Sequence, residues 1–330
     1  MSSPGLDLPE QDATLAAGVL ARQRRALAKA ITLIESSRAD HQARAQKLLE
    51  ALLPNTGKAI RIGISGVPGV GKSTVIEALG LYLIEQGHRV AVLAIDPSST
   101  ISGGSILGDK TRMELLSQRD EAFIRPSPSS GALGGVAHKT REAMLLCEAA
   151  GFDVVIVETV GVGQSETAVA GMTDVFVLLQ LPNAGDDLQG IKKGIVELAD
   201  IVTFNKADID PRAADIACGQ MRSALHMLRP LSSHWQIPVL KISAAKKEGL
   251  TEFWKTIETY RQTMQECGEF DAKRKRQALA WMWDMIETGL HQRFREHPLV
   301  KQQLAAVADA VTHEKITPAA GAHQLLGYLK

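Results

Sequence analysis

A phosphate-binding pattern near residue 70 offers the most specific chemistry in the chain. Residues 66–73 read G-x-x-x-x-G-K-S, and glycines at such positions let successive backbone N–H groups turn towards an anion. The lysine of this pattern reaches the β- and γ-phosphates of a nucleotide, and its serine hydroxyl is a ligand for Mg²⁺. An apolar β-branched run before the pattern and a helical run after it argue against the alternative, a glycine-rich turn without a ligand. The predicted phosphate-binding residues are Gly66, Val67, Pro68, Gly69, Val70, Gly71, Lys72, Ser73 and Thr74.

A second pattern, N-K-x-D, is formed by Asn205, Lys206 and Asp208. Guanine presents an N1–H and a C2 amine side by side, and one carboxylate accepts a hydrogen bond from both. Adenine lacks both donors, so the Asp208 carboxylate would discriminate against it. We expect the Lys206 stem to cover one face of the base and Asn205 to tie neighbouring loops together. The segment Ser243, Ala244 and Ala245 matches the remaining base-contact loop, with an ordinary small-residue turn as the alternative.

Carboxylates near the phosphate loop are candidates for holding the metal. Glu158 opens the segment E-T-V-G, which takes the place usually held by D-x-x-G, and the N–H of Gly161 would sense the γ-phosphate. Asp96 and Asp109 are further candidates, with helix-cap or turn roles as the alternative. The predicted metal ligands are Ser73, Asp96, Asp109 and Glu158. The predicted cofactors are therefore GTP or GDP and Mg²⁺.

The expected rate of hydrolysis depends on residues after the metal segment. Val162 stands where many small GTPases carry a water-orienting glutamine, which predicts slow hydrolysis that a partner accelerates. Residues 181–194 mix acids, lysines and glycines, as expected of a switch segment. Lys192 or Lys193 would stabilise transition-state charge there. The predicted catalytic residues are Lys72, Glu158, Gly161, Lys192 and Lys193.

Buried apolar runs must position these motifs. The runs at 60–64, 90–95, 154–157, 175–181, 201–204 and 239–242 predict strands, with helical patterns between them. Strands alternating with helices indicate a parallel sheet covered on both faces, and ligands of such sheets bind at the carboxyl ends of the strands. Each motif falls at such an end. The predicted fold is an α/β P-loop NTPase with a mostly parallel sheet flanked by helices, plus N-terminal and C-terminal helical extensions.

The extensions define three expected segments. Residues 1–57 are an N-terminal helical extension, predicted to hold one helix from about Thr14 and a second from about Asp40. Residues 58–265 are the GTPase domain, and residues 266–330 are a helical dimerisation arm. The basic run 273–276 is expected to be a solvated helix face. An apolar stripe follows it, formed by Leu279, Met282, Met285, Ile286 and Leu290, and it indicates a homodimer interface, with a flap on the main domain as the alternative.

Composition excludes several classes of protein. The chain has 330 residues with 37 basic and 37 acidic side chains, and this balance argues against a nucleic-acid partner. No apolar run approaches the length of a membrane span, so we expect no membrane partner and a cytoplasmic location. Three scattered cysteines suit a reducing compartment. His88, His138, His226 and His234 have no second ligand at metal spacing and are expected to be surface or capping residues.

Four segments together resemble the methylmalonyl-CoA mutase-associated GTPases of the MeaB/ArgK type, which are also related to the human cobalamin type A protein. They are residues 96–99 (D-P-S-S), 103–110 (G-G-S-I-L-G-D-K), 158–165 (E-T-V-G-V-G-Q-S) and 182–189 (P-N-A-G-D-D-L-Q). The resemblance covers essentially the whole chain after about residue 12. Residues 100–102 (T-I-S) depart from the Pro-Phe-Thr-like stretch that relatives often have.

This resemblance implies a GTPase that serves as chaperone for an adenosylcobalamin-dependent acyl-CoA mutase, methylmalonyl-CoA mutase. Such a chaperone gates cofactor loading and protects the mutase from inactivation. The resemblance also implies homodimers joined through the C-terminal arm, and a switch at 182–194 that faces the mutase.

Three other functions compete with this interpretation. A metal-insertion GTPase for a nickel or cobalt enzyme shares the fold but usually carries His-rich or Cys-His sites, which are not expected from this sequence. A kinase for amino-acid transport proteins needs a protein hydroxyl as acceptor, and Asp208 argues against ATP as its donor. Targeting of nascent membrane proteins needs a methionine-rich domain, whereas the nine methionines here are dispersed.

Overall fold

The computed structural model describes residues 8–95, 113–126, 133–159, 165–182, 193–227 and 232–329, with only the backbone of Lys193 and of residues 133–136. The chain divides into two compact units, Met1–Arg274 and Lys275–Lys330. The first unit contains the sheet and every predicted nucleotide-binding motif. The second is helical in its described part.

A parallel sheet forms the centre of the first unit. Its strands are β1 (Ile60–Gly66), β2 (Val90–Ile95), β3 (Ala122–Arg125), β4 (Val154–Thr159), β5 (Val175–Gln180), β6 (Ile201–Phe204) and β7 (Val239–Lys241). Their order is β3-β2-β4-β1-β5-β6-β7, and every pairing is parallel. This confirms the predicted fold class. The short edge strand β3 was not among the runs singled out from the sequence.

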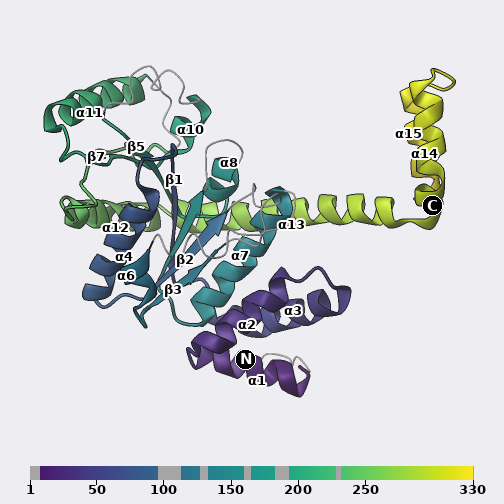
Figure 1. The fold of residues 1–330 in the computed structure, drawn as a ribbon, viewed down its shortest axis with the longest axis horizontal. Helices are drawn as coiled ribbons and strands as arrows, with labels where there is room; N and C mark the ends of the chain where they lie inside the picture. Colours follow the sequence, from purple (N-terminus) through teal and green to yellow (C-terminus); the bar gives the residue numbers. More distant parts are fainter. Residues whose placement is uncertain are drawn as a thin grey trace. The chain divides into compact units, whose positions relative to one another are not determined.

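Helices cover both faces of this sheet (Figure 1). Alternate residues of one strand enter different cores: Val154 and Ile156 of β4 face one side, and Val155 and Val157 face the other. The first core is closed by α4 (Lys72–Glu85), α6 (Glu114–Ser117) and α12 (Leu250–Glu266). The second is closed by α7 (Leu133–Ala149), α8 (Ser165–Ala170), α10 (Lys193–Leu198) and α11 (Pro211–His226). Both faces are therefore buried, as strands without polar alternation require.

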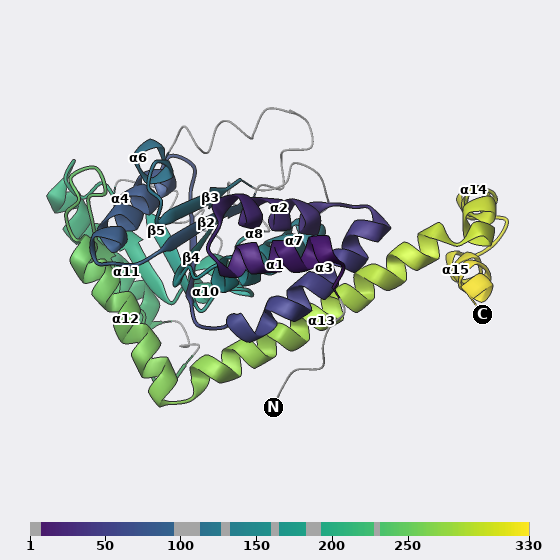
Figure 2. The same cartoon turned by 90° about the horizontal axis from the view of Figure 1, so that it is seen from below.

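Helices α1 (Glu10–Leu20), α2 (Arg24–Glu35) and α3 (Ala39–Leu52) form the N-terminal extension, which ends in the short 3-10 helix η1 (Leu53–Asn55). Figures 1 and 2 show these helices beside α7, and α2 and α3 contact it directly. The prediction of a single helix from Thr14 up to the second helix was wrong. The backbone reverses at Arg22, whose φ of 61° is left-handed, and α2 begins two residues later.

The first turns of α13 (Glu269–Glu296) are fixed to the amino-terminal ends of the central strands. Arg274 donates from Nε and Nη2 to Asp174, which precedes β5, at 2.8 and 2.7 Å. Lys273 Nζ lies 3.2 Å from Asp200, which precedes β6. The expectation that 273–276 is a solvated face was wrong for these two residues, because buried acids draw them inwards.

The second unit consists of the remainder of α13, α14 (Pro298–Thr312), α15 (Pro318–Leu326) and the short 3-10 helix η2 (Gly327–Leu329). Val300, Val307 and Leu325 are its buried apolar side chains in the described range. Large apolar side chains on α13 stay exposed, among them Leu279 (58%), Trp283 (58%) and Leu290 (59%). No described helix combines the length and apolar character that a bilayer crossing requires.

Candidate nucleotide-binding site

The phosphate loop follows β1, the central strand, and leads into α4, whose first residue is Lys72. Gly69 and Gly71 adopt left-handed φ values of 79° and 92°, which side chains rarely tolerate. The Lys72 ammonium donates to the carbonyl oxygen of Gly66 at 2.7 Å, so it lies inside the loop. The positive end of α4 and the glycine loop therefore lie together, an arrangement suited to binding a phosphate.

Asn205 and Lys206 hold the phosphate loop from the side of β6. Asn205 Nδ2 donates to the carbonyl of Val70 at 2.8 Å, and its Oδ1 accepts from the N–H of Ala244 at 3.1 Å. The Lys206 ammonium donates to the carbonyl of Gly69 at 2.9 Å. The buried Asn205 side chain thus joins three loops that follow β1, β6 and β7.

Asp208 follows this junction in the chain, and its side chain is 16% exposed. A hydrogen bond from the Ser243 side chain, followed by weaker contributions that include the charge of Lys246, holds the pKa of the Asp208 carboxyl below its ordinary value. Lys246 Nζ is 3.7 Å from its Oδ2. The carboxylate is therefore ionised at neutral pH and can accept the two donors of guanine.

Glu158 is the penultimate residue of β4, the strand next to β1. The two strands are in register so that Ile64 pairs with Glu158, and Glu158 is 3% exposed. Its neighbour Thr159 donates its hydroxyl to Ser65 at 3.0 Å, and both side chains are buried. This bond fixes the end of β4 against the residue that enters the phosphate loop.

The structure gathers one part of the predicted site and leaves another part undescribed. It brings together the loops that contain Gly66 to Thr74, Asn205 to Asp208, and Ser243 to Ala245, with Glu158 on the adjacent strand. Asp96, Asp109, Gly161 and Lys192 lie outside the described residues, as does the side chain of Lys193. Their proposed roles therefore stay predictions.

Three participants had been given no role from the sequence. Ser65 and Thr159 are small polar residues at the ends of apolar runs; Ser65 directly precedes the phosphate pattern, and Thr159 is a variable position within E-T-V-G. Lys246 lies directly after the base-contact segment and was not included in it, although its ammonium approaches Asp208.

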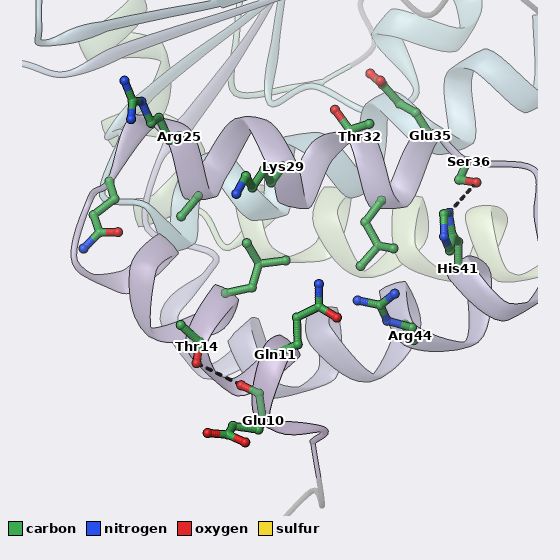
Figure 3. Close-up of a pocket in the computed structure, with 14 residues that line it drawn as sticks. Glu10, Gln11, Thr14, Arg25, Lys29, Thr32, Glu35, Ser36, His41 and Arg44 are labelled. Atoms are coloured by element: carbon green, nitrogen blue, oxygen red, sulfur yellow. Dashed lines mark hydrogen bonds between the residues drawn. The ribbon is translucent and has the colours of Figure 1, made fainter.

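A separate cavity of about 1070 Å³ lies on the N-terminal helices, between α1, α2 and α3 (Figure 3). Some of the charged side chains that line it form ion pairs. Arg44 donates to the buried Asp12 at 2.7 Å, and Glu35 pairs with Arg125. Ser36 and His41 are joined by a 2.8 Å hydrogen bond across its rim. None of the motif residues lines this cavity, so it is distinct from the nucleotide site.

The sheet is parallel, a glycine loop follows its central strand, a lysine starts the next helix, and an N-K-x-D carboxylate lies beside the loop. These features define a P-loop GTPase. Residues 27–299 match the family model of the methylmalonyl Co-A mutase-associated GTPase MeaB. The chain belongs to this MeaB family of GTPases.

Similar proteins agree with this assignment. GTPase ArgK of Escherichia coli is 46% identical over 309 residues, which is 93% of each chain. The mitochondrial methylmalonic aciduria type A homolog of Mus musculus is 47% identical over 324 residues, covering 95% of this chain and 78% of its own. A crystal structure described as a LAO/AO transport system kinase is 38% identical, with a TM-score of 0.77 over 98% of this chain and 99% of its own.

Proposed function

We propose that this protein is a Mg²⁺-dependent GTPase that acts as chaperone for an adenosylcobalamin-dependent acyl-CoA mutase. The observation that carries the nucleotide part is the ionised Asp208 carboxylate beside a phosphate loop that Asn205 holds in place. The mutase part rests on family membership, since the matching model describes methylmalonyl Co-A mutase-associated GTPases. In this role, the protein gates cofactor loading according to its nucleotide state and protects the mutase from inactivation.

The residues present suit a Mg²⁺–nucleotide complex. Ser73 and Glu158 offer a hydroxyl and a carboxylate, the hard oxygen donors that Mg²⁺ prefers. When bound, the ion neutralises charge on the β- and γ-phosphates. Lys72 would leave the Gly66 carbonyl to reach the same phosphates, while loop N–H groups bind their oxygens. The outer candidates for the metal remain Asp96 and Asp109.

Hydrolysis is proposed to be slow without a partner. Val162 has no group that orients water, so the missing catalytic contribution would come from the complex with the mutase. We assign this contribution to the switch at 182–194, with Lys192 and Lys193 facing the γ-phosphate and Gly161 sensing it. The proposed organisation keeps residues 1–57, 58–265 and 266–330 as extension, GTPase domain and dimerisation arm.

A variant that should bind xanthine nucleotides in place of guanine nucleotides tests the base-reading residue and the partner together. In an Asp208→Asn variant, the amide accepts from N1–H but meets the guanine amine with a donor, so GDP affinity should fall by at least about 100-fold. Xanthine has a carbonyl at that position, so the variant should bind xanthosine diphosphate instead. Phosphate release should be slow with wild-type protein and GTP and rise when the mutase is added.

The variant supplies the internal control for this experiment. Asp208→Asn with xanthosine triphosphate should regain stimulation by the mutase, whereas the variant with GTP should stay inactive. Unchanged GDP affinity in the variant would refute Asp208 as the base reader. Tight guanine specificity without any effect of the mutase would keep the GTPase and refute the chaperone role.

A kinase is the second candidate, because a structure described as a transport system kinase matches nearly the whole chain. The two functions differ in the acceptor of the γ-phosphoryl group, which is water in one and a protein hydroxyl in the other. GTP labelled on its γ-phosphate separates them: labelled inorganic phosphate supports the GTPase, and label retained on a protein supports the kinase.

A further inference from the structure

Three side chains of types that can ligate a metal ion lie together where α12 meets α13. His234, Cys267 and Glu269 each offer one donor atom, and all three atoms lie within 4.8 Å of one another. His234 Nε2 is 4.0 Å from Glu269 Oε1. Cys267 and Glu269 are half-buried and His234 is exposed. All three belong to the first unit.

The backbone holds these residues in place from two directions. Cys267 is the C-cap residue after α12 and Glu269 begins α13, and Gly268 between them turns the chain with a left-handed φ of 78°. On the other side, the N–H of His234 donates to Ser232 at 3.0 Å. The next residue, Trp235, donates from its indole to the carbonyl of Asp200 at 2.8 Å and packs edge-on against Tyr260.

This location separates the group from the nucleotide site. Asp200, which holds Trp235, precedes β6 and therefore lies at the amino-terminal end of that strand. Asn205 and Asp208 follow the carboxyl end of the same strand. The two sites thus lie at opposite ends of the parallel sheet, and the inference does not rest on the proposed function.

The donor types select the kind of ion. Thiolate and imidazole ligands favour zinc and similar borderline metals, whereas Mg²⁺ takes oxygen ligands. In a tetrahedral zinc site with metal–ligand distances of about 2.0–2.3 Å, donor atoms lie roughly 3.3–3.6 Å apart. The atoms here need to approach by less than about 1.5 Å, which side-chain rotation at a half-buried corner allows.

We propose that His234, Cys267 and Glu269 bind one Zn²⁺ ion, with water as the fourth ligand. The Cys267 thiol releases its proton to solvent on binding, while the imidazole and the carboxylate bind in their neutral and ionised forms. The ion ties the corner between α12 and α13 to the segment before β7. It therefore stabilises the start of α13.

Metal titration of the tag-free protein tests this site, with Mg²⁺ and GDP present to saturate the nucleotide site. Zinc should bind at one ion per chain, and Co²⁺ in its place should give a thiolate-to-metal charge-transfer band in the near ultraviolet. Cys267→Ser should abolish that band, and His234→Ala or Glu269→Gln should weaken zinc binding by more than about 100-fold, beyond the usual effect of an outer-shell change.

Neighbouring residues provide matched controls. Glu266→Gln and His226→Ala change the same side-chain types at exposed positions outside the group, so both variants should bind zinc like the wild type. Circular dichroism and GDP affinity confirm that each variant is folded. Equal zinc affinity in Cys267→Ser and wild type, or no stoichiometric binding by the wild type, would overturn the proposal.

Discussion

At the scale of single residues, both the backbone conformation and the limited space around residue 71 of the phosphate loop require glycine. Gly71 has a left-handed φ of 92°, and a Cβ built there would lie 2.7 Å from Asn205 Nδ2. Asn205 cannot move freely, because it is 2% exposed and its amide is bonded to Val70 and to Ala244. Gly69 is also left-handed, with a φ of 79°, but it has open space around its Cβ position.

Gly71→Ala should therefore destabilise the nucleotide-free protein more than Gly69→Ala. Each substitution carries a left-handed backbone cost of about 1–2 kcal/mol. Displacing Asn205 adds the loss of two hydrogen bonds of about 1 kcal/mol each. In urea without nucleotide, the unfolding free energies of the two variants should differ by about 2 kcal/mol. Equal unfolding midpoints would show that displacing Asn205 does not destabilise the protein.

At the scale of elements, buried acids before β5 and β6 fix α13 to the sheet. Asp174 is 1% exposed in its side chain and accepts from Arg274, which also donates to the carbonyls of Gly57 and Ala59 at 2.6 Å. Removing Arg274 leaves the buried Asp174 carboxylate with the N–H donor of Arg61 but without its ion pair, and breaking a buried pair in this way costs about 3–5 kcal/mol. Arg274→Ala should lower the unfolding free energy of the first unit by this amount.

Arg276 provides the matched control, because it lies on the same helix and is exposed. Arg276→Ala should change the unfolding free energy by less than about 0.5 kcal/mol. If the two variants unfold alike in urea, the contacts of Arg274 do not stabilise the protein.

A second contact between elements is sensitive to pH. Burial raises the pKa of the Glu142 carboxyl on α7, although Gln46 of α3 donates to it at 2.8 Å and the charge of Lys139 opposes the shift. A raised pKa means that the folded state binds this proton more tightly than the unfolded chain, whose glutamate pKa is about 4.3. Stability from this group is therefore fully present below that value and is lost as pH rises through the folded pKa.

Glu142→Gln removes the charge and keeps the acceptor for Gln46. The variant should match the wild type at acidic pH and become the more stable protein as pH rises towards 8. Thermal unfolding of both proteins across that range measures the difference. A constant difference in melting temperature would show that the pKa of the Glu142 carboxyl is the same in the folded and unfolded states.

Predictability from sequence also differs between elements. The loops around Lys72 and Asp208 were predictable because their motifs follow apolar strands whose carboxyl ends meet at one edge of a parallel sheet. The break at Arg22 was not, because neither glycine nor proline marks it and tertiary packing sets its φ. The approach of His234 to Cys267 was equally hidden, since it depends on how the segment before β7 meets the α12–α13 corner.

At the scale of the whole molecule, one apolar face of the second unit is exposed among the residues that the structure describes. Leu279, Met282, Ile286 and Leu290 follow helical spacing on α13 and are 58%, 45%, 40% and 59% exposed. A contiguous apolar stripe of this kind on a small helical unit is typical of a protein–protein interface. We expect a second copy of the chain to cover it, as isologous contacts in homodimers do.

Substitutions on this stripe should therefore change the oligomeric state and leave the nucleotide site intact. Ile286→Glu would bury an unpaired carboxylate in the dimer, at a cost of several kcal/mol, and should weaken dimerisation by at least about 100-fold. Thr288→Glu adds the same charge two residues on, where helical geometry points it away from the stripe, and should leave the dimer intact. Sedimentation velocity measures the oligomeric state of each variant.

GDP affinity should stay within about twofold in both variants, because the nucleotide loops belong to the first unit. A wild-type protein that sediments as a monomer, or an Ile286→Glu variant that remains a dimer, would contradict the interface.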